Sequence, residues 1–435
     1  MKDFAISDNP RVQAQLDRLG ALSLPSGRLG LDTVRELCAR LGDPQKALPP
    51  VLHVAGTNGK GSTCTYLRSM LEAEGLRVHS ATKPHLVRYN ERIRIGGHLI
   101  ADDLLADLLK EVLDAGADLE PSFFEVTTVA TFLAFHRDPA DACVIETGLG
   151  GRLDATNVLE NPLVCGISTL GLDHEAFLLA PEHGVPAEPL ARIAFEKASI
   201  AKPGVPLVTQ GYPDVAKHAV LETAQAIGAP VKMRGRDWDA ELGGSIHYRD
   251  AGGDLPLPLP ALAGAHQADN AALAVAMLRH QSVLDISLGA MGKGIVDARW
   301  PARLQRLGHG PVTAMAGGRT VWLDGGHNPD AGVAIARHLA GQPPVHLVMG
   351  MLANKDPSAI LAPLGRHALS VSIVPAPGHD AHRVEDFAPH TALPVKSFAD
   401  VPSALRALPP EGDVLIVGSL YLAGEVLRLN DEVPD

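Results

Sequence analysis

Residues 51 to 63 read Val-Leu-His-Val-Ala-Gly-Thr-Asn-Gly-Lys-Gly-Ser-Thr. The first five residues predict a buried strand, the glycines predict a turn, and apolar residues recur at helical spacing from Ser62 onward. A strand, a glycine-rich turn and a helix N-terminus form a cradle for phosphate, because backbone N–H groups and the helix dipole attract an anion. Lys60 can reach terminal phosphates, and Ser62 or Thr63 can offer a hydroxyl to Mg²⁺. The stretch therefore predicts a nucleoside triphosphate site.

The spacing departs from the general P-loop pattern. That pattern places Ser or Thr directly after the lysine, whereas Gly61 intervenes here and the loop is shorter. A glycine-rich turn without a ligand is the alternative interpretation. The nucleotide site is favoured because the strand, the lysine, the hydroxyls and the helix are all in place.

Composition narrows the class of protein. The 435 residues, of which 46% are hydrophobic, predict two domains with a core each. A net charge of −12 argues against a nucleic-acid partner. The chain has no signal-peptide pattern and no apolar run as long as the ~18 residues of a membrane helix. The cysteines lack a CxxC spacing, which is typical of buried thiols in a reducing compartment: Cys38, Cys64, Cys143 and Cys165. We therefore expect a soluble cytoplasmic protein without a membrane partner.

Strand and helix patterns alternate along the chain. Strands are predicted at 51–55, 78–81, 142–146, 162–169 and 205–210, and helices at 31–41, 102–115, 122–136, 190–201 and 268–278. This alternation predicts an α/β fold with a mostly parallel sheet that helices cover on both faces. Glycine and proline interrupt the pattern over 243–264, where we expect hairpin-like excursions. A Trp-Pro linker near 297–303 precedes a second α/β set with strands near 320–324, 345–349, 370–374 and 413–417.

Two polar residues follow strands of the first set. Ligands bind at the carboxyl ends of parallel strands, and Gly61, Glu146 and His174 all fall there. Mg²⁺ prefers oxygen ligands, so Glu146 fits a magnesium site. His174 is a softer ligand, and a structural role in the loop is the stronger interpretation for His174 taken alone.

Three further charged residues have open interpretations. The ammonium of Lys197 cannot ligate a metal, and a surface lysine paired with Glu196 is the favoured interpretation from physics alone. Asp324 ends a strand and could accept hydrogen bonds from a ribose, while Asn328, directly before Pro329, suits a helix N-cap. Arg303 could reach phosphate or be a solvated linker charge.

Seven motifs taken together resemble one family. The motifs are Gly56 to Thr63 and, after it, 84–93, 146–157, 172–174, 196–198, 324–329 and 418–421. In this order they resemble folylpolyglutamate synthase and dihydrofolate synthase of the Mur ligase superfamily over nearly the whole chain. The cell-wall Mur ligases have a hydroxyl residue directly after the lysine, so Gly61 favours the folate branch. The resemblance implies an N-terminal P-loop ATPase-type domain with a pterin site over 1–298. It implies a smaller, Rossmann-like C-terminal domain of the glutamate-ligase type over 299–435.

The resemblance also implies roles for individual residues. The ATP-binding residues would be Thr57, Asn58, Gly59, Lys60, Gly61, Ser62, Asn270, Arg303 and Asp324. The metal ligands would be Ser62, Glu146, His174 and Lys197, with Lys197 converted to an anionic carbamate by CO₂, and Lys60, His174 and Lys197 would be the catalytic residues. The pterin site would contain Arg28, Leu29, Gly30, Leu31, Ser122, Phe123, Phe124, Glu125, Leu153, Asp154 and Ala155. His327 and Ser419 would bind the incoming glutamate.

Three departures from the family pattern concern the metal and pterin sites. Lys83 stands where the family has a serine that supports a Mg²⁺ ion, so a cation there could neutralise phosphate directly. Leu178-Leu179 replaces a Leu-Gly element and is followed by an apparent insertion through Glu188. Arg28-Leu29-Gly30 replaces Asp-Leu-Gly on the pterin side.

The implied activity is that of an ATP-dependent amide ligase. It would add L-glutamate to dihydropteroate, to the glutamate tail of folate, or to both, through an acyl phosphate, with ATP as co-substrate and one or two Mg²⁺ ions. We expect a monomer. The alternatives are a superfamily ligase with a different carboxylate substrate, an ATP-binding regulatory homologue without ligase activity, and a general α/β NTPase.

Overall fold

A computed structural model describes residues 6–22, 30–380 and 382–435 of the chain, which divide into two units. The first unit comprises Met1–Pro84, Arg88–Ala261 and Ala268–Ala298. The second unit comprises His85–Val87, Leu262–Gln267 and Arg299–Asp435. Two short segments from the earlier part of the chain therefore belong to the second unit.

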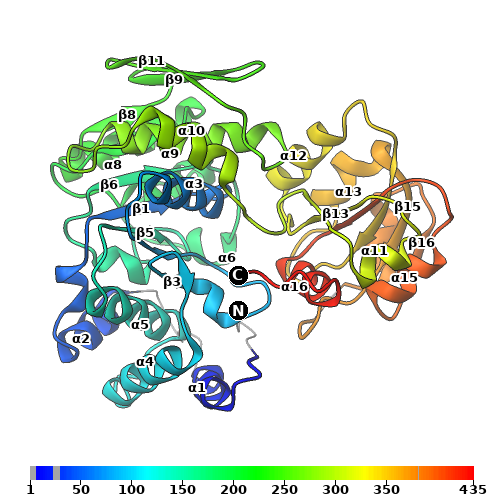
Figure 1. The fold of residues 1–435 in the computed structure, drawn as a ribbon, viewed down its shortest axis with the longest axis horizontal. Helices are drawn as coiled ribbons and strands as arrows, with labels where there is room; N and C mark the ends of the chain where they lie inside the picture. Colours follow the sequence, from blue (N-terminus) through cyan, green and yellow to red (C-terminus); the bar gives the residue numbers. More distant parts are fainter. Residues whose placement is uncertain (1–5, 23–29, 381) are drawn as a thin grey trace. The chain divides into compact units, whose positions relative to one another are not determined.

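The first unit is built on a large sheet (Figure 1). In the described residues the sheet has eight strands in the order β4-β3-β2-β5-β1-β6-β7-β8. The strands are β1 (Val51–Ala55), β2 (Val78–Ala81), β3 (Ile93–Ile95), β4 (His98–Leu99), β5 (Ala142–Glu146), β6 (Val164–Ile167), β7 (Leu207–Thr209) and β8 (Val231–Met233). All neighbouring pairs from β2 to β8 are parallel, whereas β3 and β4 are antiparallel additions at one edge. The predicted mostly parallel sheet is confirmed.

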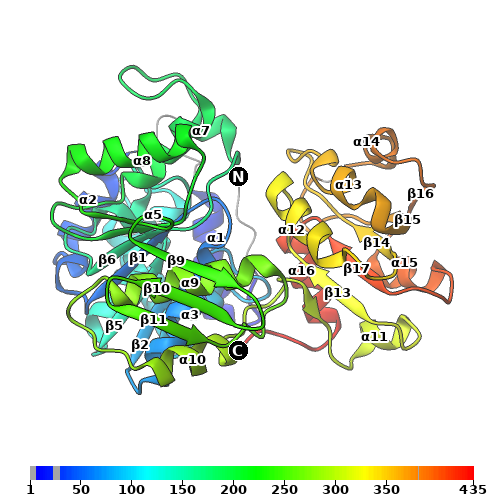
Figure 2. The same cartoon turned by 90° about the horizontal axis from the view of Figure 1, so that it is seen from above.

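Helices cover both faces of this sheet (Figure 2), because its strands are apolar on both sides. The helices of the first unit are α1 (Pro10–Ala21), α2 (Asp32–Arg40), α3 (Lys60–Ala73), α4 (Asp102–Ala115), α5 (Phe123–Arg137), α6 (Glu175–Leu178), α7 (Pro189–Ala198), α8 (Asp214–Ile227), α9 (Ala265–Arg279, whose first three residues fall in the second unit) and α10 (Leu288–Asp297). Helices α1, α2, α4 and α5 share one hydrophobic core with β1 and β5. Helices α7 and α8 share another core with β6 and β7.

Short 3₁₀ helices occupy several connections. They are η1 (Pro44–Ala47), η2 (Tyr89–Arg92) and η3 (Ala155–Val158) in the first unit, and η4 (Gly365–His367) and η5 (Ala388–His390) in the second.

The helix predictions are correct in place and differ at the ends. Helix α4 has the predicted bounds, and α5 begins one residue after Ser122, whose side chain caps it. Helix α3 begins at Lys60 instead of the predicted Ser62, because Gly59 takes a left-handed conformation (φ 84°) as the N-cap. Helix α7 ends at Ala198, three residues before the predicted end.

A separate antiparallel sheet follows α8. Its strands are β9 (Trp238–Leu242), β10 (Ile246–Asp250) and β11 (Gly253–Leu257), in the order β11-β10-β9. Hairpin connections were predicted over 243–264, and the sheet confirms them, although β9 begins earlier than that range. The pattern is a simple meander, because each strand pairs with the next one along the chain.

The second unit contains a sheet of six strands in the order β12-β13-β17-β14-β15-β16 among the described residues. The strands are β12 (Gln305–Arg306), β13 (Val321–Asp324), β14 (Val345–Met349), β15 (Ala368–Ile373), β16 (Val395–Ser397) and β17 (Val414–Val417). The helices are α11 (Pro311–Met315), α12 (Pro329–Leu339), α13 (Ser358–Leu364), α14 (Val384–Phe387), α15 (Val401–Ala407) and α16 (Leu420–Leu429). The predicted second α/β set is confirmed, with two additional short strands at the sheet edges.

Two further expectations concern cysteines and membranes. All four cysteines are buried and free, as their spacing predicts. Across residues 6–22, 30–380 and 382–435, no helix combines the length and the apolar character needed to cross a membrane.

Candidate active site

The glycine-rich turn between β1 and α3 requires glycine at two positions. Gly59 has φ 84°, and a Cβ atom there would lie 2.3 Å from Oδ1 of Asn270. Gly56 has φ 152°, and a Cβ atom there would lie 1.9 Å from Oγ of Ser168. The predicted nucleotide residue Asn270, far away in sequence on α9, therefore lies against the turn.

The segment after β6 holds this turn in place. The N–H group of Thr57 donates to the carbonyl of Thr169 (2.7 Å), and the Thr57 hydroxyl donates to the carbonyl of Gly171 (2.9 Å). The Ser168 hydroxyl donates to the carbonyl of Asn58 (2.7 Å). The turn is thus fixed before a ligand arrives, which favours tight binding of an anion.

Two lysines converge on one carbonyl of the turn. Nζ of Lys60 donates to the carbonyl oxygen of Gly56 (3.0 Å), and Nζ of Lys197 donates to the same oxygen (2.9 Å). Lys197 is only 4% exposed, so the interpretation of Lys197 as a surface lysine is wrong. Burial lowers the pKa of Lys197 to about 7, and the positive charge of Lys60 adds to this shift. Nearby carboxylates such as Asp173 oppose it. A substantial fraction of Lys197 is therefore a neutral amine near pH 7.

The donor atoms near this turn fit a magnesium–nucleotide complex. Ser62 and Thr63, in the first turn of α3, are buried, and the Thr63 hydroxyl has no hydrogen-bond partner among the described residues. Glu146 is 3% exposed at the end of β5, the neighbour of β1. No group of three or more His, Cys, Asp or Glu side chains in the described ranges could hold a metal alone. Mg²⁺ suits such a site because it draws on one or two carboxylates, water and substrate phosphates.

His174 lies in the loop between β6 and α7. It is the residue before the short helix α6, it is half-buried, and its backbone is left-handed (φ 54°). Its N–H group bonds the carboxylate of Asp173 (2.8 Å). Since β6 is the neighbour of β1 on the side opposite β5, His174 and Glu146 follow strands that flank the phosphate turn.

Asp154 organises the loop that follows Glu146. One carboxylate oxygen of Asp154 accepts hydrogen bonds from the N–H groups of Gly148 and Leu149 (2.8 Å each). The other accepts the N–H group (3.0 Å) and the hydroxyl (2.6 Å) of Thr156. The pKa of this buried carboxyl is lowered, because the positive charge of Lys83 and these hydrogen bonds outweigh the opposing effect of burial. The carboxylate is therefore ionised and already well solvated by the protein.

A buried histidine extends this network and was missed in the sequence. Nε2 of His53 lies 2.8 Å from the Thr156 hydroxyl, and this hydroxyl donates its hydrogen to the carboxylate of Asp154. Nε2 must therefore donate, which leaves Nδ1 as an acceptor with no partner in the described structure. Burial lowers the pKa of His53 to about 3. His53 sits within an apolar strand pattern, so no sequence signal distinguished it.

Four of the predicted pterin residues, Ser122 to Glu125, stand at the start of α5. Ser122 and Glu125 form a capping box, in which Glu125 accepts from the Ser122 N–H group (2.7 Å). Phe123 packs edge-to-face against Phe124 (ring centroids 5.4 Å apart), and Phe124 is 38% exposed. Leu31, Phe123 and Ala155 pack on the same hydrophobic core. Gly30 is exposed, whereas Arg28 and Leu29 lie outside the described residues.

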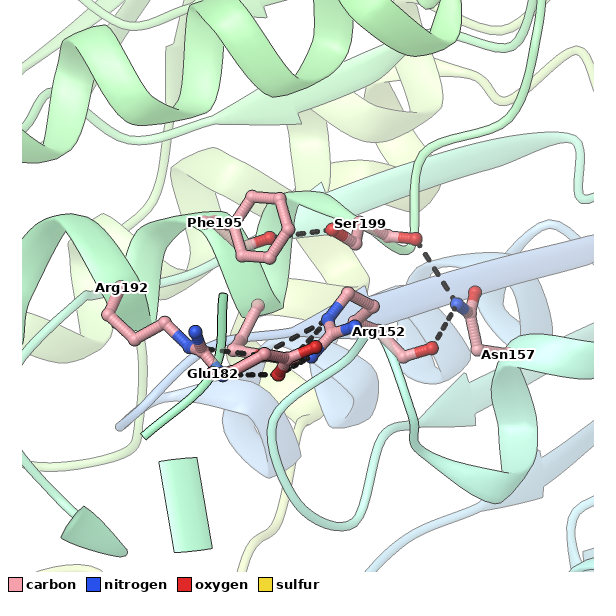
Figure 3. A network of polar contacts seen from close by, with 7 residues as sticks. Arg152, Asn157, Glu182, Arg192, Phe195 and Ser199 are labelled. Atoms are coloured by element: carbon pink, nitrogen blue, oxygen red, sulfur yellow. Dashed lines mark hydrogen bonds and ion pairs between the residues drawn. The ribbon is translucent and has the colours of Figure 1, made fainter. Parts of the chain in front are cut away.

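An ion-pair network connects the glycine loop after β5 with helix α7 (Figure 3). The Arg152 guanidinium bonds the carboxylates of Glu182 (2.6 Å) and Glu196 (2.9 Å). Arg192 also bonds Glu182 (2.8 Å), and the Arg152 N–H group donates to the carbonyl of Glu196 (2.7 Å). Glu196 therefore pairs with arginines, while its neighbour Lys197 donates to the carbonyl of Gly56 in the glycine-rich turn.

A cavity of about 490 Å³ opens beside this network. Its apolar lining includes Leu149, Leu153, Phe177 and Leu178, and its charged lining includes Arg152 and Glu182. Residues 176–182 therefore form one wall, and the predicted pterin residue Leu153 forms part of another.

The predicted residues of the second unit lie near the carboxyl ends of neighbouring strands. Asp324 ends β13, and its two oxygens accept from the N–H groups of Leu304 (2.8 Å) and Gly326 (2.6 Å). Ser419 caps α16 after β17, the strand that pairs with β13. His327 is half-buried, with Nδ1 3.0 Å from the carbonyl oxygen of Gly325. A Cβ atom on Gly325 would lie 3.1 Å from Nη1 of Arg303, so Arg303 lies beside the same loop. Asn328 caps α12, as predicted.

Comparisons with known proteins give the family of this chain. The Escherichia coli protein named dihydrofolate synthase/folylpolyglutamate synthase is 34% identical over 93% of this chain and 92% of its own length. The chain belongs to the dihydrofolate synthase/folylpolyglutamate synthase family. No family model matches the sequence.

Solved structures agree with this assignment. E. coli FolC in complex with DHPP and ADP has a TM-score of 0.84 and 32% identity, over 96% of this chain and 97% of that chain. A bifunctional folylpolyglutamate synthase/dihydrofolate synthase with Mn, AMPPNP and L-glutamate bound has a TM-score of 0.83 and 31% identity, over 98% and 99% of the two chains. The family resemblance, the Mur ligase fold and the prediction of an ATP- and divalent-metal-dependent ligase are thereby confirmed.

Proposed function

We propose that this chain joins the amino group of L-glutamate to a folate-type carboxylate at the expense of ATP. The acceptor is the carboxylate of dihydropteroate, the glutamate tail of a folate, or both. The observation that carries the proposal is the preformed glycine-rich turn, with Lys60 and Lys197 on one carbonyl and the buried Ser62 and the unpartnered Thr63 hydroxyl beside it. The related structures that hold ADP with DHPP, or an ATP analogue with L-glutamate, support it.

The reaction proceeds in two displacements. A carboxylate oxygen of the acceptor attacks the γ-phosphorus of ATP, the bond to the β-phosphate oxygen breaks, and ADP leaves. The neutral amine of glutamate then attacks the acyl carbon, the C–O bond to phosphate breaks, and the amine loses a proton. Lys60 offsets charge on the transferring phosphoryl group, and the N–H groups of the turn hold the phosphates.

Mg²⁺ would be held by Ser62 and Glu146, with His174 and a carbamate of Lys197 as further ligands. When bound, the ion supplies charge neutralisation to the nucleotide phosphates. The burial of Lys197 and its pKa of about 7 favour the carbamate, because only the neutral amine attacks CO₂. Thr57, Asn58, Gly59, Gly61, Asn270, Arg303 and Asp324 complete the proposed nucleotide contacts.

The exposed ring of Phe124 and the half-buried Phe123 and Leu153 offer apolar surface for a pterin ring. The remaining residues proposed for the pterin are Gly30, Leu31, Ser122, Glu125, Asp154 and Ala155, with Arg28 and Leu29 beyond the described residues. His327 and Ser419 are proposed for glutamate. We further propose that the protein is a cytoplasmic monomer without a nucleic-acid partner.

Measurement of ADP formation tests this function. We expect ADP release with dihydropteroate or tetrahydrofolate only when glutamate and Mg²⁺ are also present, together with a product heavier by one glutamyl group. ATP binding without ADP release on any of these acceptors would contradict the proposal. It would favour the alternative of a regulatory homologue, for which the unusual Lys83 and the altered loop after His174 are the best support.

A further inference from the structure

Lys83 stands at the same sheet edge as the phosphate turn. It follows β2, and β2, β5 and β1 are consecutive in the sheet. The Lys83 N–H group donates to Oε2 of Glu146 (2.9 Å). The backbone of Lys83 is therefore tied to the carboxylate that ends the neighbouring strand.

The ammonium group of Lys83 is held close to the loop after β5. A Cβ atom on Gly148 would lie 3.5 Å from Nζ of Lys83 and 3.1 Å from Oδ2 of Asp154. Burial lowers the pKa of Lys83; the charges of Asp154 and Glu146 oppose this shift, and those of Arg92 and Lys60 add to it. Nζ therefore lies near the Asp154 carboxylate, at the loop that follows Glu146.

The ammonium of Lys83 interacts electrostatically with Asp154 but has no hydrogen-bond partner among the described residues. Lys83 is half-buried, yet Nζ makes neither a hydrogen bond nor an ion pair within 4 Å with any residue in the described ranges. Asp154 does not need Lys83 for hydrogen bonding, because its oxygens already accept four hydrogen bonds. A partly desolvated ammonium with open donor positions is unfavourable unless a ligand supplies acceptors. A phosphoryl oxygen is such an acceptor.

We propose that Lys83 is a catalytic residue that binds the phosphoryl group during its transfer from ATP to the substrate carboxylate. This inference rests on the proposed function. The ammonium acts as a fixed positive charge opposite Lys60, and the developing charge on the phosphoryl oxygens lies between the two. Because an ammonium beside Glu146 repels a second cation there, the site binds a single divalent ion with the nucleotide.

The test compares Lys83→Met and Lys83→Arg with Lys202→Met. Lys202 is a matched control because it is also half-buried, and its Nζ bonds Asn157 (2.9 and 3.0 Å) instead of facing the turn. We expect Lys83→Met to lower kcat for ADP formation about 100-fold, with the KM for glutamate changed less than threefold. Lys83→Arg should restore at least a tenth of kcat, and Lys202→Met should retain kcat. A thermal melt of each variant reports folding.

A second readout does not depend on activity. Mn²⁺ titration followed by electron paramagnetic resonance, with AMPPCP bound, should give one ion per chain for the natural protein. It should give two ions for Lys83→Ser, which exchanges the charge for a hydroxyl. Lys83→Met should also weaken AMPPCP binding at least tenfold at a fixed Mn²⁺ concentration.

The outcomes separate the two proposals. Folded Lys83→Met with kcat and AMPPCP affinity within twofold of the natural protein would overturn the role of Lys83, as would two bound Mn²⁺ ions in the natural protein. If the natural protein releases no ADP with any acceptor, the proposed function fails. The Mn²⁺ count and the AMPPCP affinity then still decide whether Lys83 contacts phosphate.

Discussion

At the scale of single residues, the site depends on charges held in unusual surroundings. Lys60 and Lys197 share the carbonyl of Gly56, and burial lowers the pKa of Lys197 to about 7. His53 is neutral inside the first strand. Substitution of Lys60 should change the rate of turnover, and substitution of His53 should change the pH dependence of stability.

Replacement of Lys60 by alanine should abolish turnover. The lysine contacts the turn that we propose binds phosphate, and loss of one such donor typically lowers kcat by about 10²–10³ or more. Lys110→Ala is the control, since Lys110 is exposed and pairs with Asp114. ADP release that depends on pteroate and glutamate and survives Lys60→Ala at a normal rate would refute the assignment.

His53 should make the folded state sensitive to acid. Its folded pKa of about 3 lies below the ordinary 6.5, so the unfolded chain binds more protons between these values. The stability that neutral His53 contributes is complete above pH 6.5 and is lost as pH falls toward 3. At pH 5 the loss should be about 2 kcal/mol.

Urea unfolding at pH 7 and pH 5 measures this loss. His53→Gln cannot titrate but keeps a donor for Thr156, so it isolates the histidine from other acid-sensitive groups. The free energy of unfolding should fall about 2 kcal/mol more between the two pH values in the natural protein than in His53→Gln. An equal fall in both proteins would show that His53 is already able to accept a proton when folded.

At the scale of elements, the sequence predicted what depends on local pattern. The strand–turn–helix at 51–73, the second α/β set and the cap at Asn328 follow from periodicity and from cap and turn chemistry. The short edge strands β12 and β16 were missed because two or three partly exposed residues carry no period. The network of Arg152 could not be predicted, since Glu182 and Arg152 lie 30 residues apart and pair only after folding.

Glu182 should anchor segment 175–188, which precedes helix α7. It neutralises Arg152 and Arg192, so Glu182→Gln leaves two guanidinium groups against Glu196 alone. We expect a loss of about 1–3 kcal/mol in unfolding free energy and faster proteolysis within residues 175–188. Glu175→Gln is the control, because Glu175 is exposed and makes no side-chain hydrogen bond in the described structure. Equal cleavage rates in the two variants would refute the anchoring role.

At the scale of the whole molecule, segments distant in sequence build one unit. Leu86 and Val87 pack on the core of the second unit with strands β13 and β17 and helix α16. A Cβ atom on Gly424 of α16 would lie 1.9 Å from the carbonyl oxygen of Leu86. The second unit is therefore completed by three residues from the loop that follows Lys83 and Pro84.

Gly424→Ala should therefore destabilise the protein. The added methyl group meets backbone, which cannot yield as a flexible side chain can, and we expect a loss of about 1–3 kcal/mol. Gly365→Ala is the matched control, since a Cβ atom there meets nothing within 4 Å. Thermal unfolding of both variants checks the prediction, and similar melting temperatures would show that the loop of Leu86 moves aside without loss.

The division of the chain into two units limits how the units can be exchanged by recombination. The polypeptide passes between its units after Pro84, Val87, Ala261, Gln267 and Ala298. A single recombination breakpoint in the gene therefore cannot exchange one complete unit for a homologous one. In a chimera joined at Ala298, most of the second unit would come from one parent and its residues 85–87 and 262–267 from the other. To exchange the complete unit, those nine codons would have to be exchanged together with the 3′ part of the gene.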